Sequence, residues 1–210
     1  MDGALSCAGL NRETDNQPDR VGTFADAKPG CACEHETLSE YSPGLVSGEE
    51  IIARMVCVPQ HVHPKRAELN SSFFSHAFSR GASVQRLEAS ADEELLGCVE
   101  GLLSSGDDRQ WLGYVSARAS EIRAIQAGGD ETQTFCVADA ALHDNQAHAE
   151  IHCARRIPDA DRIERRVQLM KLFNAGGIQN RRSLRDGKIW TALSGDLRSR
   201  PVPKQWEALA

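Results

Sequence analysis

The chain has 210 residues, of which 40% are hydrophobic and 26% charged, values typical of one globular domain with tails. No run approaches the roughly 18 apolar residues that a membrane span needs, so we expect no membrane segment. The net charge of −6 argues against a protein that is basic throughout, as a dedicated nucleic-acid binder would be.

Residues 1–42 are predicted to form a flexible arm. The stretch NRETDNQPDR is polar, and prolines and glycines interrupt the rest, so little surface is available to offset the loss of chain entropy. Met1–Leu5 contain neither a basic nor an apolar region, which argues against a secretory signal. We therefore expect a cytoplasmic protein of bacterial type.

The cysteine count is seven, an odd number in a chain with no expected export signal. A disulfide framework is therefore not expected, and free thiols or a partial metal site are the more natural interpretation. The cysteines are Cys7, Cys31, Cys33, Cys57, Cys98, Cys136 and Cys153.

Three helices and one strand are predicted between residues 47 and 125. In SGEEIIARMVCV, Ser47 and Glu50 fit a capping box, and the apolar spacing favours a helix that ends before Pro59. A second capping box opens a helix over residues 90–106, and SVQRLE before it favours a strand, with Ser83 and Gln85 on one face. WLGYVSARASEIRAI is ambiguous, but its spacing favours a helix over residues 111–125.

Two strands and a helix are predicted next. TFCVADAAL and AHAEIHCA are joined by HDNQ, as expected for an antiparallel hairpin. A helix over residues 159–173 follows, with Ile163, Val167, Met170 and Phe173 on its buried face and Gly176-Gly177 as its stop signal. The order favours an α+β fold with a small antiparallel or mixed sheet: a flexible arm (1–42), a core domain (43–175) and a basic C-terminal extension (176–210).

The stretch AHAEIHC, residues 147–153, carries the most chemistry. Along a strand, His148, Glu150 and His152 would share one face, and two histidines with a carboxylate suffice to bind zinc or non-haem iron. A hydrolase-like enzyme would then use Glu150 and His148 as catalytic groups. The alternative interpretation is an ordinary strand, whose polar face is wet and whose apolar face packs in the core.

Several better-defined motifs are excluded. A helical H-E-x-x-H site needs the glutamate directly after the first histidine, whereas here it comes one position late. His148-Ala149-Glu150 matches the start of the nucleobase-deaminase signature, but no cysteine follows Cys153 to complete the zinc ligands. Neither a G-x-S-x-G elbow nor a nucleotide-binding glycine motif occurs.

A second possible zinc site combines cysteines and histidines from the first third of the chain. A zinc ion could join the arm to the end of the first predicted helix, although the spacing is not that of the common C-x-x-C knuckle. The alternative is an oxidation-prone tail beside a polar loop. The candidate ligands are Cys31, Cys33, His35, Cys57, His61 and His63.

The C-terminal quarter is basic. Residues 155–210 carry 13 basic and 6 acidic residues, a net of +7, which leaves 11 basic and 24 acidic residues, a net of −13, in residues 1–154. The basic end could bind an acidic partner such as nucleic acid, or it could fold back onto the acidic body. The candidate phosphate- or partner-binding residues are Arg155, Arg156, Arg162, Arg165, Arg166, Arg181, Arg182 and Arg185.

Two functions are therefore predicted. The first is an interaction protein that docks a protein, or a nucleic acid, through its basic end. The second is a metal-dependent, hydrolase-like enzyme built on His148, Glu150 and His152.

Overall fold

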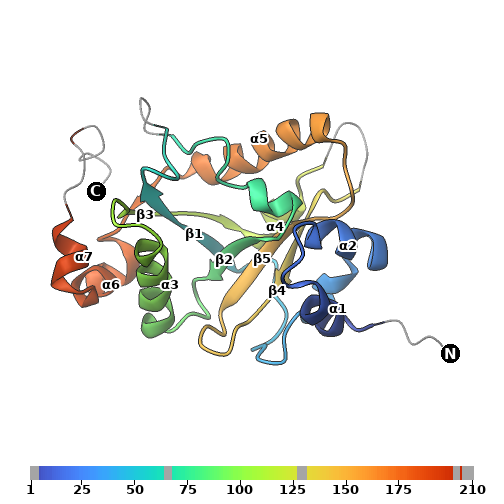
Figure 1. Cartoon of the computed structure of the whole chain (residues 1–210), viewed down its shortest axis with the longest axis horizontal. Helices are drawn as coiled ribbons and strands as arrows, with labels where there is room; N and C mark the ends of the chain where they lie inside the picture. Colours follow the sequence, from blue (N-terminus) through green and yellow to red (C-terminus); the bar gives the residue numbers. More distant parts are fainter. Residues whose placement is uncertain (1–4, 64–67, 127–131, 201–203, 205–210) are drawn as a thin grey trace.

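A computed structural model describes residues 5–63, 68–126, 132–200 and 204. Its centre is a six-stranded sheet in the order β4-β5-β2-β1-β3-β6, in which all neighbours are antiparallel. With the surrounding helices this makes an α+β fold with a small sheet, as predicted (Figure 1). The strands are β1 (Ile51–Val58), β2 (Ala82–Arg86), β3 (Gln110–Arg118), β4 (Phe135–Asp139), β5 (His148–Cys153) and β6 (Gln179–Asn180).

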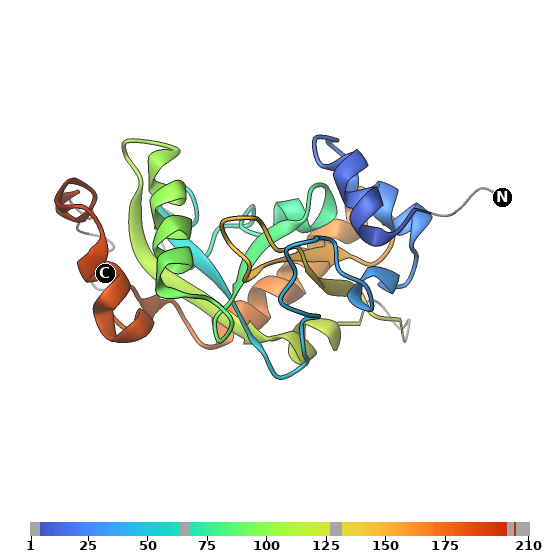
Figure 2. The ribbon, with the colours of Figure 1, turned by 90° about the horizontal axis from the view of Figure 1, so that it is seen from below.

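Helices cover both faces of the sheet (Figures 1 and 2). One face packs against α5 (Asp159–Ala175) and the 3-10 helix η2 (Ser75–Phe78), forming the largest apolar core. The other face meets α3 (Asp92–Ser104) at one end and the N-terminal helices at the other. The described residues include no helix long and apolar enough to cross a membrane.

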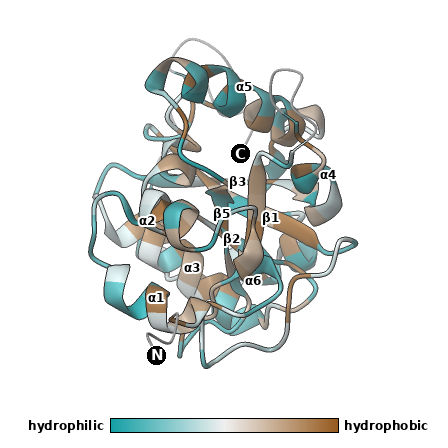
Figure 3. Ribbon diagram, turned by 90° about the vertical axis from the view of Figure 1, so that its right-hand side faces the viewer, coloured by the Kyte–Doolittle hydropathy of each residue, from teal (hydrophilic) through white to brown (hydrophobic). Residues whose placement is uncertain are grey.

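The predicted helix over residues 47–58 is wrong, because this segment contains the central strand β1. β1 lies between β2 and β3 and is buried along most of its length, which Figure 3 shows as a hydrophobic ribbon. Its apolar residues fit helical spacing, but sheet partners on both sides favour the extended form. The capping-box residues still contact each other, since the Ser47 amide donates to Glu50 Oε1 (2.7 Å), but they close a turn before the strand.

The predicted helix over residues 111–125 is also wrong in its first half. β3 pairs with β1 through eight residue pairs, and only Ala119–Arg123 form a helix, α4. Gly113 in β3 allows the short strand β6 to approach, because a Cβ atom there would lie 1.8 Å from the carbonyl oxygen of Gln179. The strand at β2, the helix at α3, the hairpin of β4 and β5 and the helix at α5 are confirmed.

The buried face of α5 differs from the predicted one. Leu169 and Phe173 are fully buried, whereas Ile163 and Val167 are 59% and 40% exposed. The helix therefore meets the sheet on a face rotated from the expected stripe, and much of its ribbon has the colour of hydrophilic residues (Figure 3). Which face of α5 is buried depends on the position of the sheet against which it packs, and helical periodicity cannot specify that position.

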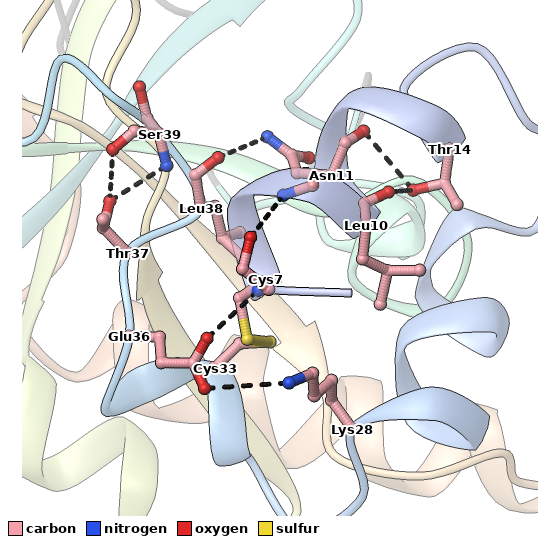
Figure 4. Close-up of a disulfide and its surroundings, with 12 residues drawn as sticks. Cys7, Leu10, Asn11, Thr14, Lys28, Cys33, Glu36, Thr37, Leu38 and Ser39 are labelled. Atoms are coloured by element: carbon pink, nitrogen blue, oxygen red, sulfur yellow. Dashed lines mark hydrogen bonds and ion pairs between the residues drawn. A yellow bond between two sulfur atoms is a disulfide. The ribbon is translucent and has the colours of Figure 1, made fainter. Parts of the chain in front are cut away.

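The N-terminal segment is not the loosely structured arm that its composition predicts. Residues 5–42 contain α1 (Cys7–Thr14), α2 (Arg20–Ala27) and the 3-10 helix η1 (Ala32–Glu34), and they form a small core with β4. Disulfide Cys7–Cys33 (Figure 4) and disulfide Cys31–Cys136 hold the segment, so the expectation of no disulfides is also wrong. Covalent cross-links reduce the entropy of the unfolded chain, which compensates for the polar composition.

After α5 the chain returns to the sheet edge and then covers α3. The described part of the C-terminal extension contains β6, the 3-10 helix η3 (Leu184–Gly187), α6 (Lys188–Ala192) and α7 (Gly195–Ser199). Leu184, Ile189 and Leu193 bury their side chains with those of α3 and Trp111. This part of the extension is therefore integrated into the fold.

Candidate functional site

The strand β5 places its polar and apolar residues on opposite faces, as predicted. Ala149, Ile151 and Cys153 are at most 4% exposed and pack in the main core. The opposite face is not wet, because His148 and His152 are only 7% and 4% exposed. The N-terminal segment covers part of it, and the Phe24 ring lies 5.6 Å from the His152 ring in an edge-to-face contact.

His148 forms a hydrogen-bonded chain with a serine that the sequence motifs did not indicate. Its Nδ1 lies 2.8 Å from the carbonyl oxygen of Ala140, and its Nε2 lies 2.5 Å from Ser83 Oγ. Because a carbonyl only accepts, Nδ1 carries a proton, and in that tautomer Nε2 can accept a hydrogen bond from the Ser83 hydroxyl. Ser83 is exposed, so this hydroxyl can be reached from outside.

Glu150 and His152 belong to a separate buried ion cluster with Arg20 from α2. Glu150 Oε2 accepts from Arg20 Nη1 (2.7 Å) and from His152 Nε2 (2.6 Å). Arg20 also donates to Asn11 Oδ1 and to the carbonyl oxygen of Arg80. Burial alone would raise the pKa of Glu150, but the hydrogen bond and charge of His152 and the charge of Arg20 lower it to about 2.

Gly81 allows the chain to pass close to this cluster. Its φ of +94° is a conformation that other residues rarely adopt, and a Cβ atom there would lie 2.5 Å from Glu150 Oε2. The ion cluster and its surrounding backbone therefore fit closely. Glu150, predicted as a catalytic group, is engaged in holding α2 against the sheet.

A pocket of about 270 Å³ lies where β1 and β2 part. These strands pair at Ile52–Arg86 and Ala53–Gln85, and the next residues of each strand line the pocket. Helix α3 contributes Cys98 and Leu102, and the turn after β1 contributes Gln60 and His61. Ser83, the hydrogen-bond partner of His148, stands in the lining of this hollow, which is large enough for a small molecule.

Two buried polar groups of the pocket have no hydrogen-bond partner among the described residues: Arg54 Nη1 and Gln85 Oε1. The guanidinium of Arg54 lies over the rings of Phe73 (4.7 Å) and Phe74 (5.2 Å). Burial lowers the pKa of Arg54 to about 10, which leaves it a cation at neutral pH. A buried donor and a buried acceptor without partners are each costly unless a ligand satisfies them.

The titratable neighbours of Arg54 are neutral. Burial raises the pKa of the Cys98 thiol to about 11, against a smaller opposing effect of the Gln85 side chain, which hydrogen-bonds it. Burial and the nearby charges of Arg54 and Arg109 lower the pKa of His61 to about 3. The positive charge of Arg54 is therefore not cancelled by these groups at neutral pH.

The predicted metal ligands of β5 are not brought together as a set of three, although Glu150 and His152 contact each other. Among the residues that the structure describes, no group of three or more His, Cys, Asp or Glu side chains could hold a metal ion. Both ring nitrogens of His148 are hydrogen-bonded, and His152 Nε2 is occupied by Glu150. Cofactor binding by the triplet therefore has no geometric support in the described part of the chain.

The second zinc candidate set is divided between different surroundings. Cys31 and Cys33 are oxidised, and a disulfide sulfur is not the thiolate that zinc requires. His35 is exposed. Cys57 Sγ lies 3.6 Å from His61 Nδ1, but burial raises the pKa of this thiol to about 11, which disfavours the thiolate.

Three of the candidate partner-binding arginines contact distant parts of the fold, and Arg162 pairs locally with Asp159 (2.9 Å). Arg156 pairs with Asp19 and Asp26 of the N-terminal segment, and Arg185 donates to two carbonyl oxygens near the start of α3. Arg181 is buried, donates to the Trp111 carbonyl and lies 3.9 Å from the Trp190 ring centroid. The remaining five lie on or next to α5 or at an exposed turn: Arg155, Arg162, Arg165, Arg166 and Arg182.

Sequence reasoning missed Ser83, Arg54, Gln85 and Arg20. The available signal was the alternation in SVQRLE, which places Ser83 and Gln85 on one face of a strand. It gave no indication that β5 would be the neighbouring strand, or that Arg54 would lie on a strand at all.

A comparison with protein-family models, curated proteins and solved structures finds no match to this chain.

Proposed function

We propose that the protein is a serine-dependent esterase in which Ser83 is the nucleophile and His148 the general base. The observation that carries this proposal is the chain Ser83 Oγ–His148 Nε2 (2.5 Å) and His148 Nδ1–Ala140 O (2.8 Å). A nucleophile within hydrogen-bond reach of a base, which a third group orients, is the arrangement that activates a hydroxyl.

The proposed reaction proceeds in two steps. Ser83 Oγ attacks the ester carbonyl carbon while its proton passes to His148 Nε2, and the departing alkoxide then takes that proton as the carbon–oxygen bond breaks. Water next attacks the acyl-serine with His148 again accepting a proton, which returns to Ser83 Oγ as the acid is released. The Ala140 carbonyl holds the ring in the required tautomer and stabilises the imidazolium that forms.

The two functions predicted from the sequence remain proposals with less support. A metal-dependent hydrolase needs ligands that the described residues do not bring together. Docking of a protein or nucleic acid through the basic end relies on arginines of which three contact the body. The cytoplasmic localisation also stays a prediction, and two disulfides argue against it, since they persist mainly in oxidising compartments.

Labelling with a fluorophosphonate tests the proposal without knowledge of the substrate. We expect covalent modification of Ser83, located by mass spectrometry of peptides, together with slow hydrolysis of p-nitrophenyl acetate. Ser83→Ala should abolish both, and His148→Asn should lower both by about 100-fold or more, as loss of a general base does. The control Ser105→Ala, an exposed serine at the end of α3, should behave as the parent protein. Equal labelling of Ser83→Ala would overturn the proposal.

A further inference from the structure

We propose that the pocket between β1 and β2 binds a small organic carboxylate that also carries an N–H or O–H donor. The carboxylate would contact Arg54 and the donor would contact Gln85. This inference goes beyond the proposed reaction, because it concerns the ligand that fills the pocket and holds whether or not Ser83 is a nucleophile.

Arg54 determines the charge of the ligand. Its Nη1 is buried without a hydrogen-bond partner among the described residues, and its guanidinium is held over Phe73 and Phe74. The rings stabilise the cation, and Nη1 still lacks the acceptor that a ligand could supply. An anion supplied from outside would restore the charge compensation that the pocket lacks.

Gln85 determines the second feature of the ligand. Its side chain is 3% exposed, its Oε1 has no partner among the described residues, and it stands in the same lining as Arg54. A carbonyl oxygen accepts hydrogen bonds only, so the ligand must present a donor as well as an anion. Inorganic phosphate at neutral pH provides charge in excess, whereas a carboxylate with an amide N–H matches both groups.

The remaining lining limits the size and polarity of the ligand. Ala53, Met55, Val84 and Leu102 are apolar, and the volume is about 270 Å³. These residues would contact a short aliphatic portion of the ligand, as in other small-molecule sites. N-acetylglycine, which combines a carboxylate, an amide N–H and a small methyl group, is a suitable probe.

Isothermal titration calorimetry with three related compounds tests this inference on the full chain. N-acetylglycine should bind, whereas 4-oxopentanoate, in which a methylene replaces the N–H, should bind roughly fivefold to tenfold more weakly. N-acetylglycinamide, which lacks the carboxylate, should bind at least about tenfold more weakly. Absence of binding of N-acetylglycine at millimolar concentration, or tighter binding of inorganic phosphate, would overturn the inference.

Variants locate the binding in the pocket. Arg54→Met keeps the packing against the phenylalanine rings and should abolish N-acetylglycine binding, with folding checked by circular dichroism. Should this variant not fold, Arg54→Lys keeps the charge without the planar fork and should lower affinity about tenfold. Gln85→Met should remove the preference for N-acetylglycine over 4-oxopentanoate. Ser105→Ala, which changes an exposed serine outside the pocket, should bind as the parent does. Binding of N-acetylglycine and fluorophosphonate labelling of Ser83 are separate readouts, so failure of the pocket and failure of the proposed reaction are distinguishable; unchanged binding by Arg54→Met would contradict the inference.

Discussion

His148, Glu150 and His152 alternate along β5, and each has a different set of partners. His148 contacts Ser83 and a backbone carbonyl, whereas Glu150 contacts Arg20 and His152. One strand face therefore holds a group suited to proton transfer beside a buried ion cluster that fixes α2. The roles of His148 in proton transfer and of His152 in the ion cluster differ because their hydrogen-bond partners differ, although the residue type is the same.

Replacement of Glu150 by glutamine should lower the free energy of unfolding by about 3–5 kcal/mol at pH 7, because Arg20 would keep a buried charge without its partner. The folded pKa of Glu150 is about 2, below its ordinary value of 4.5, so its charge stabilises the fold above about pH 4.5. That contribution is lost as the pH falls toward 2. Urea denaturation of parent and variant should therefore show a difference that narrows between pH 4.5 and 2.

The exposed pair Arg118–Glu49 provides a matched control, with side chains 51% and 85% exposed. Glu49→Gln should leave the free energy of unfolding unchanged within error at both ends of the range, pH 4.5 and pH 2, because water screens such exposed pairs. A pH-independent difference for Glu150→Gln, or equal effects at the two sites, would mean that Glu150 does not carry the buried charge.

At the scale of elements, the N-terminal segment acts as a cross-linked cover of one sheet end. The Cys7–Cys33 disulfide joins α1 to η1, and nearby contacts bind the helix to the following loop: the Cys7 amide donates to Glu36, and Asn11 donates to the Leu38 carbonyl (Figure 4). Cys31–Cys136 then joins η1 to β4. Since Arg20 lies within this segment, the disulfides also maintain the ion cluster of Glu150.

Thiol titration of the unfolded, unreduced protein should detect three thiols, those of Cys57, Cys98 and Cys153, and seven after reduction. The pair of changes Cys31→Ser and Cys136→Ser opens a link across 105 residues and should lower the stability by about 5 kcal/mol. The pair Cys7→Ser and Cys33→Ser opens a link across 26 residues and should cost about 3.5 kcal/mol. Seven thiols before reduction would show that neither disulfide forms.

Over the whole molecule, the basic C-terminal part and the acidic remainder compensate each other through contacts. Arg156 on the chain after β5 pairs with Asp19 and Asp26, which lie about 130 residues earlier. Arg185 pairs with Asp92 at the start of α3 (3.5 Å). The opposite charges of the two parts therefore meet at the surface, where water screens pairs as exposed as these.

A salt series tests the prediction of a partner that the basic end would bind. If a nucleic acid binds there, the affinity for a 20-mer duplex in fluorescence anisotropy should fall steeply as salt rises from 50 to 200 mM, by about 10³-fold or more for six or more phosphate contacts. Arg165→Gln with Arg166→Gln on α5 should weaken this binding, while Arg156→Gln, already paired with aspartates, should change it less. Absence of binding, or binding insensitive to salt, would exclude the nucleic-acid version.

Much of the fold could be predicted from local pattern. The helices at α3 and α5, the strand β2 and the hairpin of β4 and β5 follow from apolar spacing and from turn residues. The errors at β1 and β3 have one cause. The apolar residues of Ile51–Val58 and Gln110–Arg118 fit both helical and strand periodicity. The two segments pair with each other over eight positions, and this pairing makes them strands.

The sequence by itself determined that His148, Glu150 and His152 share one face of a strand, because side chains alternate along any extended chain. Only the tertiary structure decided what that face meets. Ser83 is 65 residues from His148 in sequence and Arg20 is 130 residues from Glu150, and both are brought into contact by strand order and by the folding of the N-terminal segment. Local spacing contains no information on such distant contacts, which arise from burial of the whole core.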